Sequence, residues 1–200
     1  MINIAIFASG SGTNAEAIMR HFEGSTRGRV ALLLSNREDA YALKRAEGFG
    51  VPTAVFTREE FGEPGGRVAS LLQEHGIDFI VLAGFLWLVP HYLTDAYAGR
   101  IVNIHPALLP KFGGRGMYGD RVHRAVIEAG ERESGITIHW VNERYDSGDT
   151  IFQATVAVDA DDTADTLAAK IHVLEHRHFP TVIEETIAGL SPIDTKQNTK

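Results

Sequence analysis

The sequence predicts an α/β fold in which a mostly parallel, doubly wound sheet carries an antiparallel edge near its C-terminal end. Short runs of β-forming residues alternate with amphipathic helical segments, the pattern of a parallel sheet covered by helices. The first run, residues 2–8, is apolar almost throughout, as expected for a strand buried on both faces. The 200 residues, 44% of them hydrophobic, suffice for one core. We therefore expect a single Rossmann-like domain.

The regular alternation runs from the N-terminus to residue 105. Strands are predicted at residues 2–8, 30–35, 53–56, 78–83 and 100–105. Helices are predicted at residues 14–22, 38–49 and 67–75, where apolar side chains recur at helical spacing. These segments predict the parallel part of the sheet.

The C-terminal half departs from this alternation. A glycine-rich loop, residues 106–119, is longer than a simple connector. It is followed by a predicted helix at 120–129 and by two alternating segments, 135–141 and 150–158, that predict the antiparallel edge. Residues 163–188 are helical in character, and Pro180 predicts an interruption. We assign residues 1–190 to the domain and 191–200 to a polar tail.

Composition and charge exclude several classes of function. The formal net charge is −7 and no run of Lys or Arg exceeds two residues, so a nucleic-acid partner is disfavoured. The chain has no cysteine, which rules out disulfides and thiolate chemistry. The longest apolar stretch, around residues 80–90, is too short to span a bilayer, and the first residues do not resemble a signal peptide. We expect a cytoplasmic protein without a membrane partner.

A glycine turn, residues 10–14, lies between the first strand and the first helix. Glycines let the backbone turn tightly, and the amide groups at a helix N-terminus favour an anion. The turn therefore predicts a phosphate site built by Gly12, Thr13 and Asn14. The alternative is a structural turn in which Thr13 or Asn14 merely caps the helix.

The same turn also fits a dinucleotide-binding fingerprint, with Gly10, Gly12 and Ala15 in the three small positions. An NAD-dependent enzyme would need an acidic residue at the end of the second strand, and this strand ends in Ser35, Asn36 and Arg37. An NADP-dependent oxidoreductase stays open through Arg37, as does a non-catalytic nucleotide-binding module.

The fifth predicted strand carries two polar side chains near its C-terminal end. Asn103 and His105 are two residues apart, so they share one face of the strand with Ile101. The C-terminal ends of strands are where open α/β sheets bind ligands. A histidine can transfer a proton near neutral pH, and an amide can donate to an oxyanion. The pair predicts a catalytic centre. The alternative is that both are structural groups at the end of a strand, with their hydrogen bonds made within the protein.

The segment that begins at Asn103, Asn-Ile-His-Pro-Ala-Leu-Leu-Pro, resembles the signature of the folate-dependent formyltransferases. Three other segments agree with the family in order and spacing, and the similarity covers about residues 1–190. These segments are Ser9–Asn14, Leu82–Val89 and Tyr145–Ile151. The resemblance implies transfer of a formyl group from the co-substrate 10-formyltetrahydrofolate to the amine of glycinamide ribonucleotide, the third step of purine biosynthesis.

The resemblance also implies a role for each matching residue. Asn103, His105 and Asp146 would be catalytic, with no covalent intermediate. The other sites would hold the two substrates. They are Gly12, Thr13, Asn14 and Glu175 for the ribonucleotide, and Leu86, Trp87, Leu88 and Val89 for the folate. Taken alone, Asp146 is a natural turn former and Glu175 a solvated charge, and the alternative for residues 86–89 is plain core after a buried strand.

Some features leave alternatives open. No known family role fits Arg115, Met117 and Tyr118 in the long loop, and neither Arg58 nor Arg67 aligns cleanly with an arginine of the folate site. Three histidines between residues 172 and 178 suggest a metal, but no suitable further ligand is evident, so no metal is expected. Formylation of methionyl-tRNA and hydrolysis of the formyl-folate are disfavoured, since a tRNA-binding basic surface and an extra N-terminal domain are lacking. We expect a monomer or a homodimer.

Overall fold

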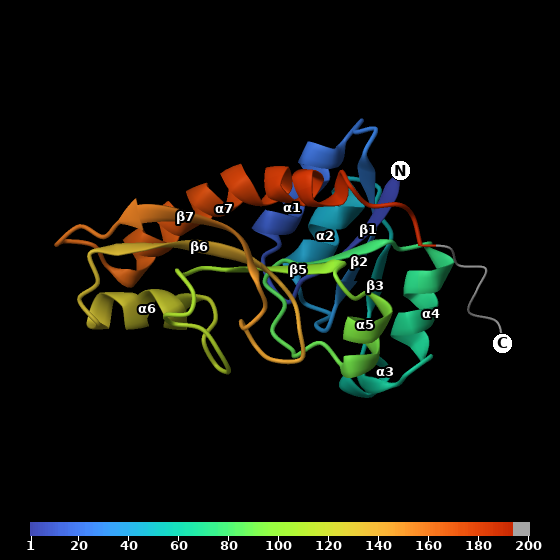
Figure 1. The fold of residues 1–200 in the computed structure, drawn as a ribbon, viewed down its shortest axis with the longest axis horizontal. Helices are drawn as coiled ribbons and strands as arrows, with labels where there is room; N and C mark the ends of the chain where they lie inside the picture. The colour runs from blue at the N-terminus through green and yellow to red at the C-terminus, as the bar shows by residue number, and fades with distance from the viewer. Residues whose placement is uncertain (194–200) are drawn as a thin grey trace.

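The computed structural model describes residues 1–193 of the chain, and the polar tail predicted at 191–200 lies mostly outside these residues. One seven-stranded sheet runs through the molecule in the order β3-β2-β1-β4-β5-β6-β7 (Figure 1). The strands are β1 (Ile2–Phe7), β2 (Gly28–Ser35), β3 (Thr53–Val55), β4 (Phe79–Leu82), β5 (Ile101–His105), β6 (Glu133–Trp140) and β7 (Thr150–Ala157). The first five pair in parallel, and β6 and β7 add the antiparallel edge, which confirms the predicted fold class.

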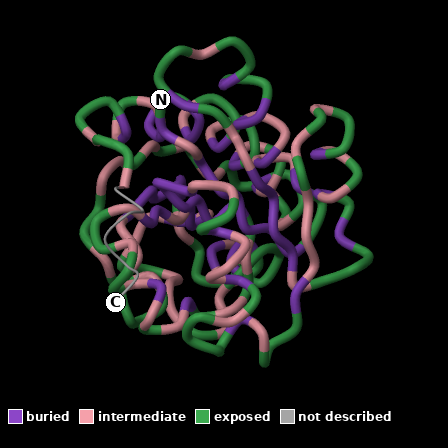
Figure 2. Tube along the Cα trace, turned by 90° about the vertical axis from the view of Figure 1, so that its right-hand side faces the viewer, coloured by how far each residue is buried: buried purple, intermediate pink, exposed green. Residues whose placement is uncertain are grey.

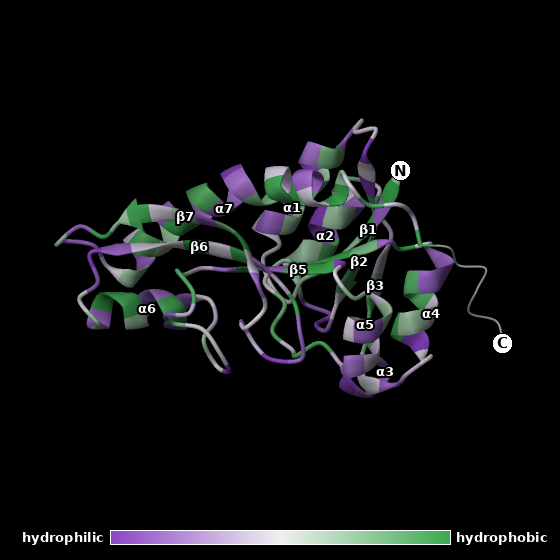
Figure 3. Cartoon of the chain, in the orientation of Figure 1, coloured by the Kyte–Doolittle hydropathy of each residue, from purple (hydrophilic) through white to green (hydrophobic). Residues whose placement is uncertain are grey.

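Helices cover both faces of the sheet (Figure 1). Two hydrophobic clusters fill the spaces between the helices and the sheet, one on each face. The first cluster takes its helical residues from α1 (Thr13–Phe22), α2 (Tyr41–Gly48), α6 (Asp120–Glu128) and α7 (Ala164–Ile187). The second takes them from α3 (Arg58–Gly62), α4 (Arg67–Glu74) and α5 (His91–Ala96). Figure 2 shows the buried segments gathered inside a shell of exposed ones, and Figure 3 shows the hydrophobic residues along the central strands.

The central strands are apolar because both of their faces are covered. In β1, Ile4 and Ile6 pack in the first cluster, and Ala5 and Phe7 in the second. The same alternation places Ile101 in the second cluster, on the face of β5 that also carries Asn103 and His105. The predicted orientation of these side chains is thereby confirmed.

The prediction of an interruption at Pro180 is wrong. Helix α7 runs unbroken over 24 residues, with Pro180 inside it. A proline removes one intrahelical hydrogen bond and crowds the preceding turn. This cost is offset by burial, because Pro180 and its neighbours Phe179 and Ile183 are buried, the latter two in the first cluster. Thr163 starts the helix with a capping box.

Two short helices, α3 and α5, were not predicted. A sequence signal for α3 exists, because Thr57 and Glu60 form a capping box at its start. Helix α5 spans only six residues, too few for a helical period to stand out. Within residues 1–193, no helix has the length and apolar character that a membrane span requires.

Candidate active site

A cleft of about 1000 Å³ opens where β1 and β4 lie side by side, at the carboxyl ends of the parallel strands. The strand order changes direction at this point, and open α/β sheets bind ligands there. Every site residue that the sequence predicted lines this one cleft: Gly12, Thr13, Asn14, Leu86, Trp87, Leu88, Val89, Asn103, His105, Asp146 and Glu175. The fold thus brings together segments separated by more than a hundred residues.

The glycine turn forms one wall of the cleft. Gly12 adopts a left-handed conformation with φ of +73°, and a Cβ at this position would lie 2.5 Å from the Cα of Ala42. Only glycine allows both this backbone and the close approach of α2. Among residues 1–193, the amide groups of Gly12, Thr13 and Asn14 donate no hydrogen bond within the protein. Free donors at a helix N-terminus are suited to receive an anion, as the sequence predicts for this turn.

Asn14 and Glu175 meet at the same wall of the cleft. The Asn14 amide nitrogen donates to a Glu175 carboxylate oxygen at 3.0 Å. Glu175 is only 6% exposed, so it is not the solvated helix charge that its local sequence suggests. Burial raises its pKa, against the opposing effects of Asn14 and His172. Within the described residues the side-chain oxygen of Asn14 is buried without a partner, which leaves an acceptor for a bound ligand.

The polar centre lies on β5 and on the neighbouring β6. In their antiparallel register Asn103 pairs with His139. The Asn103 amide nitrogen lies 3.0 Å from Nε2 of His139, and Nδ1 of His139 lies 2.8 Å from the carbonyl oxygen of Trp140. His139 therefore donates through Nδ1 and accepts from Asn103 through Nε2. This contact fixes the orientation of the Asn103 amide.

His139 is a site residue that sequence reasoning missed. It is 2% exposed and lines the cleft. In the local sequence, residue 139 is only one of the alternating positions of a strand, and nothing there marks it as a site residue. The register between β5 and β6, which places His139 opposite Asn103, would have revealed it.

Asp146 reaches the centre from the loop between β6 and β7. Its carboxylate lies 3.4 Å from the Asn103 amide nitrogen and 3.5 Å from Nδ1 of His105, and it accepts from the Gly114 amide at 2.9 Å. The backbone of Asp146 is left-handed, with φ of +50°. Aspartate tolerates this conformation better than most residues, and such backbone strain clusters at functional sites.

The loop that carries Asp146 packs closely against the end of β6. A Cβ at Gly148 would lie 1.8 Å from the carbonyl oxygen of Trp140, so only glycine lets the loop pack there. The side chain of Asn142 accepts from the Arg144 amide and from the Ser147 hydroxyl, which closes the loop on itself. Asp146 is therefore more than a turn former, since the turn holds its carboxylate in the polar centre.

The ionisation of the centre follows from burial and from these contacts. Burial lowers the pKa of His105 below its usual value, and the Asp146 carboxylate and the Phe112 carbonyl offset this only in part. Burial acts to raise the pKa of Asp146, but the neighbouring His139 and His105 rings and the hydrogen bond from the Gly114 amide outweigh it, and the net pKa is lowered. At neutral pH a neutral His105 thus lies beside an ionised Asp146. Nε2 of His105 donates to the Phe112 carbonyl at 2.8 Å, which leaves Nδ1 able to take up a proton.

Residues 84–89 form a second wall of the cleft. Leu86 and Leu88 are 36% and 41% exposed, so this segment is not plain core. The Leu86 amide donates to the Ser9 hydroxyl at 3.1 Å, which ties the wall to the end of β1. Trp87 packs against a cluster of phenylalanines at ring-centroid distances of 6.0–6.2 Å: Phe56, Phe61 and Phe85. The wall offers exposed apolar side chains suited to a flat, largely apolar ligand.

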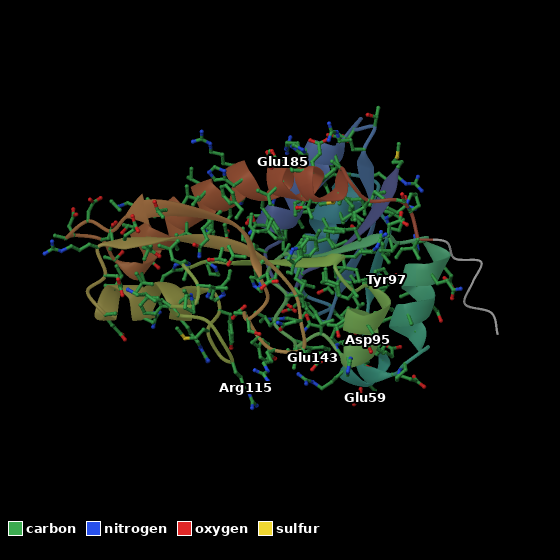
Figure 4. All side chains as sticks on the ribbon, viewed as in Figure 1. Glu59, Asp95, Tyr97, Arg115, Glu143 and Glu185 are labelled. Atoms are coloured by element: carbon green, nitrogen blue, oxygen red, sulfur yellow. The ribbon has the colours of Figure 1, made fainter. Side chains whose placement is uncertain are left out.

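Arg58 lies at the outer side of this wall, with its guanidinium 4.5 Å from the centre of the Trp87 ring. Arg67 does not line the cleft and instead pairs with Glu60. The long loop also contributes, since Arg115, Met117 and Tyr118 line the cleft. Figure 4 shows Arg115 and Glu143 on the same, lower side of the molecule. Arg58, rather than Arg67, is the arginine next to the predicted folate wall.

In the part of the chain that the structure describes, no group of three or more His, Cys, Asp or Glu side chains is placed to hold a metal ion. His172 and His176 stack with ring centroids 6.2 Å apart, and His178 stacks on Phe152.

Comparisons with known proteins agree with the cleft. Residues 2–183 match the formyl transferase family. A chloroplastic phosphoribosylglycinamide formyltransferase of Arabidopsis thaliana is 41% identical over 98% of this chain and 71% of its own length. The phosphoribosylglycinamide formyltransferase of Haemophilus influenzae is 37% identical over 92% of this chain and 86% of its own length. The crystal structure of a phosphoribosylglycinamide formyltransferase from Bacillus halodurans superimposes with a TM-score of 0.84 at 38% identity, covering 94% of this chain and 96% of the other. The chain belongs to the formyl transferase family, among the phosphoribosylglycinamide formyltransferases.

Proposed function

We propose that this enzyme transfers the formyl group of 10-formyltetrahydrofolate to the amine of glycinamide ribonucleotide, with Asn103, His105 and Asp146 as its catalytic residues. The observation that carries the proposal is one continuous cleft lined by the free amides of the glycine turn, by the apolar wall and by the polar centre. A phosphorylated acceptor held by the turn and a flat donor held by the wall would both lie in the cleft that Asn103 and His105 also line.

The ribonucleotide occupies the part of the cleft at the glycine turn. The amides of Gly12, Thr13 and Asn14 receive the phosphate, because they are free donors at a helix N-terminus. Glu175 lies beside them and accepts hydrogen bonds from the sugar or the amine. The phosphate thus anchors one end of the acceptor while its amine points to the polar centre.

The folate occupies the wall formed by Leu86, Trp87, Leu88 and Val89. The exposed side chains of Leu86 and Leu88 cover its ring faces, and the backbone of the wall offers hydrogen bonds to the ring edge. Arg58, next to Trp87, supplies positive charge at the outer end of the wall, where the carboxylates of the folate leave the cleft.

The chemistry is acyl transfer between two amines. The lone pair of the acceptor amine attacks the formyl carbon, and the carbonyl oxygen becomes an oxyanion that the Asn103 amide stabilises. Nδ1 of His105 takes the proton that the attacking amine loses, and the Asp146 carboxylate stabilises the resulting imidazolium. The bond from the carbon to the folate nitrogen then breaks, and that nitrogen receives the proton. No covalent enzyme intermediate forms.

A spectrophotometric transfer assay tests the proposal. The purified protein should deformylate 10-formyltetrahydrofolate only when glycinamide ribonucleotide is present. Equal turnover without the ribonucleotide would contradict the proposal in favour of a hydrolase. Oxidation of NADPH with a small carbonyl compound would favour the oxidoreductase that the glycine turn also suggests.

The proposal concerns a single domain, residues 1–190, that works in the cytoplasm as a monomer or a homodimer. The plant relative is described as chloroplastic, so the compartment is a separate question from the reaction. Fractionation of the native cells and sedimentation of the purified protein test these two points.

A further inference from the structure

One arginine of α2 reaches the back of the glycine turn. Nε of Arg45 donates to the carbonyl oxygen of Ser11 at 2.8 Å, and Nη1 pairs with the carboxylate of Glu16 on α1. The Arg45 guanidinium also lies 4.9 Å from the centre of the Tyr41 ring. These contacts fix a half-buried guanidinium in one place, so that it bridges the turn and the first helix.

The contact with Ser11 determines where the next amide points. In a trans peptide the carbonyl and the N–H project in opposite directions from the same plane. Because Arg45 holds the Ser11 carbonyl on the side of α2, the N–H of Gly12 is directed away from α2. Gly12 lines the cleft, and within residues 1–193 its N–H has no protein acceptor.

A second effect of Arg45 is electrostatic. Glu16 lies in the first turn of α1, beside the glycine turn, and an uncompensated carboxylate there would repel a phosphate. Arg45 and Arg20 both pair with Glu16, Arg20 at 3.0 Å. Arg45 alone combines this pairing with a hydrogen bond to the turn.

We propose that Arg45 is the positioning residue of the phosphate site: its hydrogen bond to Ser11 aims the Gly12 amide at the phosphate of the acceptor. The inference rests on the proposed function for the identity of the acceptor. Arg45 is not among the residues that line the cleft, so its removal should weaken phosphate binding and leave the chemical step intact.

The test compares Arg45→Gln with Lys44→Gln. Lys44 is the preceding residue on the same helix, is exposed and contacts only the Tyr41 ring, so its variant removes the same charge without touching the turn. Arg45→Gln should raise the KM for glycinamide ribonucleotide about tenfold, the size of one misdirected charge-assisted contact. The kcat and the KM for the folate should stay within about twofold of the wild type, and Lys44→Gln should match the wild type throughout.

A calorimetric titration with ribose 5-phosphate gives a readout that needs no turnover, so it distinguishes this inference from a failure of the proposed reaction. Binding should weaken about tenfold in Arg45→Gln and not in Lys44→Gln. Equal weakening in both variants, or none in either, would overturn the proposal.

Two further variants separate the roles of Arg45. In Arg45→Gln/Glu16→Gln the unpaired carboxylate is gone, and the loss should persist, because the Ser11 carbonyl is still released. Full recovery in this double variant would show that charge compensation was the whole effect and would overturn the positioning role. Should Arg45→Gln not fold, Arg45→Lys keeps the charge but offers one nitrogen in place of the two that contact Ser11 and Glu16. An unchanged affinity of this variant for ribose 5-phosphate would contradict the proposal.

Discussion

The two halves of the cleft are built in opposite ways. At the glycine turn the ligand-facing groups are backbone amides, and glycine appears because a side chain at Gly12 would collide with Ala42. At the junction of β5 and β6 the ligand-facing groups are side chains, and their positions depend on one register and one loop. The first half should therefore respond to changes of packing, and the second to changes of chemistry that leave the shape intact.

The largest expected effect is in the second half. Asp146→Asn keeps the shape of the side chain, and asparagine also tolerates the left-handed backbone, so the variant should fold. It loses the carboxylate that stabilises charged His105, and kcat should fall by roughly 10²–10⁴-fold, the usual range for general acid–base contributions. Both KM values should change much less.

Steady-state kinetics of Asp146→Asn, His105→Asn and the double variant provide the check. The double variant should be far less than additively worse, because the two residues act as a unit. If the kcat of Asp146→Asn lies within about threefold of the wild-type value, the loss is smaller than the lower bound for acid–base catalysis. Asp146 would then be only a turn residue.

The next effect tests the backbone-built half. In Gly12→Ala the new Cβ meets the backbone of Ala42 at 2.5 Å, and alanine disfavours φ of +73°. The turn must shift, and the KM for the ribonucleotide should rise about tenfold or more, since 1.4 kcal/mol corresponds to a factor of ten. Gly10→Ala is the control, because nothing lies within 4 Å of a Cβ there. Equal KM values for the two variants would contradict the packing argument.

A smaller effect is expected for the side chain that links the turn to α7. Asn14→Ala removes the hydrogen bond to Glu175, worth about 1 kcal/mol. Ribonucleotide affinity should fall about fivefold, and folate affinity should not change. A titration in which folate binding is lost and ribonucleotide binding survives would reverse the assignment of the two parts of the cleft.

The smallest effect is a shift of the pH profile. Burial lowers the pKa of His105 below 6.5, so kcat/KM should fall on the acid side only below about pH 6.5, as His105 becomes protonated before the reaction. Asp146 raises the pKa of His105, and removing its charge should move this acid limb to lower pH in Asp146→Asn. An acid limb that stays in place in the variant would exclude His105 as the group that titrates.

The same contrast explains which features could be predicted from the sequence. The apolar alternation predicted the sheet, and the two-residue spacing placed Asn103 and His105 on one face. Contacts between residues far apart in the sequence had no local signal. Asp146 and Glu175 were assigned only through the family resemblance. His139 was missed because the sequence of one strand does not determine its register with the neighbouring strand. Pro180 was wrongly predicted to break α7, since tertiary packing there outweighs a local preference.

The pairing of Asn103 with His139 has a consequence for engineering. A one-residue deletion within β6 would turn every later side chain of that strand to the opposite face, and a hydrophobic residue would take the place of His139. A change of strand length would therefore abolish the chemistry even if the sheet still formed. Libraries that seek new acyl acceptors should keep the lengths of β5 and β6 fixed and vary Arg115, Met117 and Tyr118 of the long loop, which line the cleft without setting that pairing.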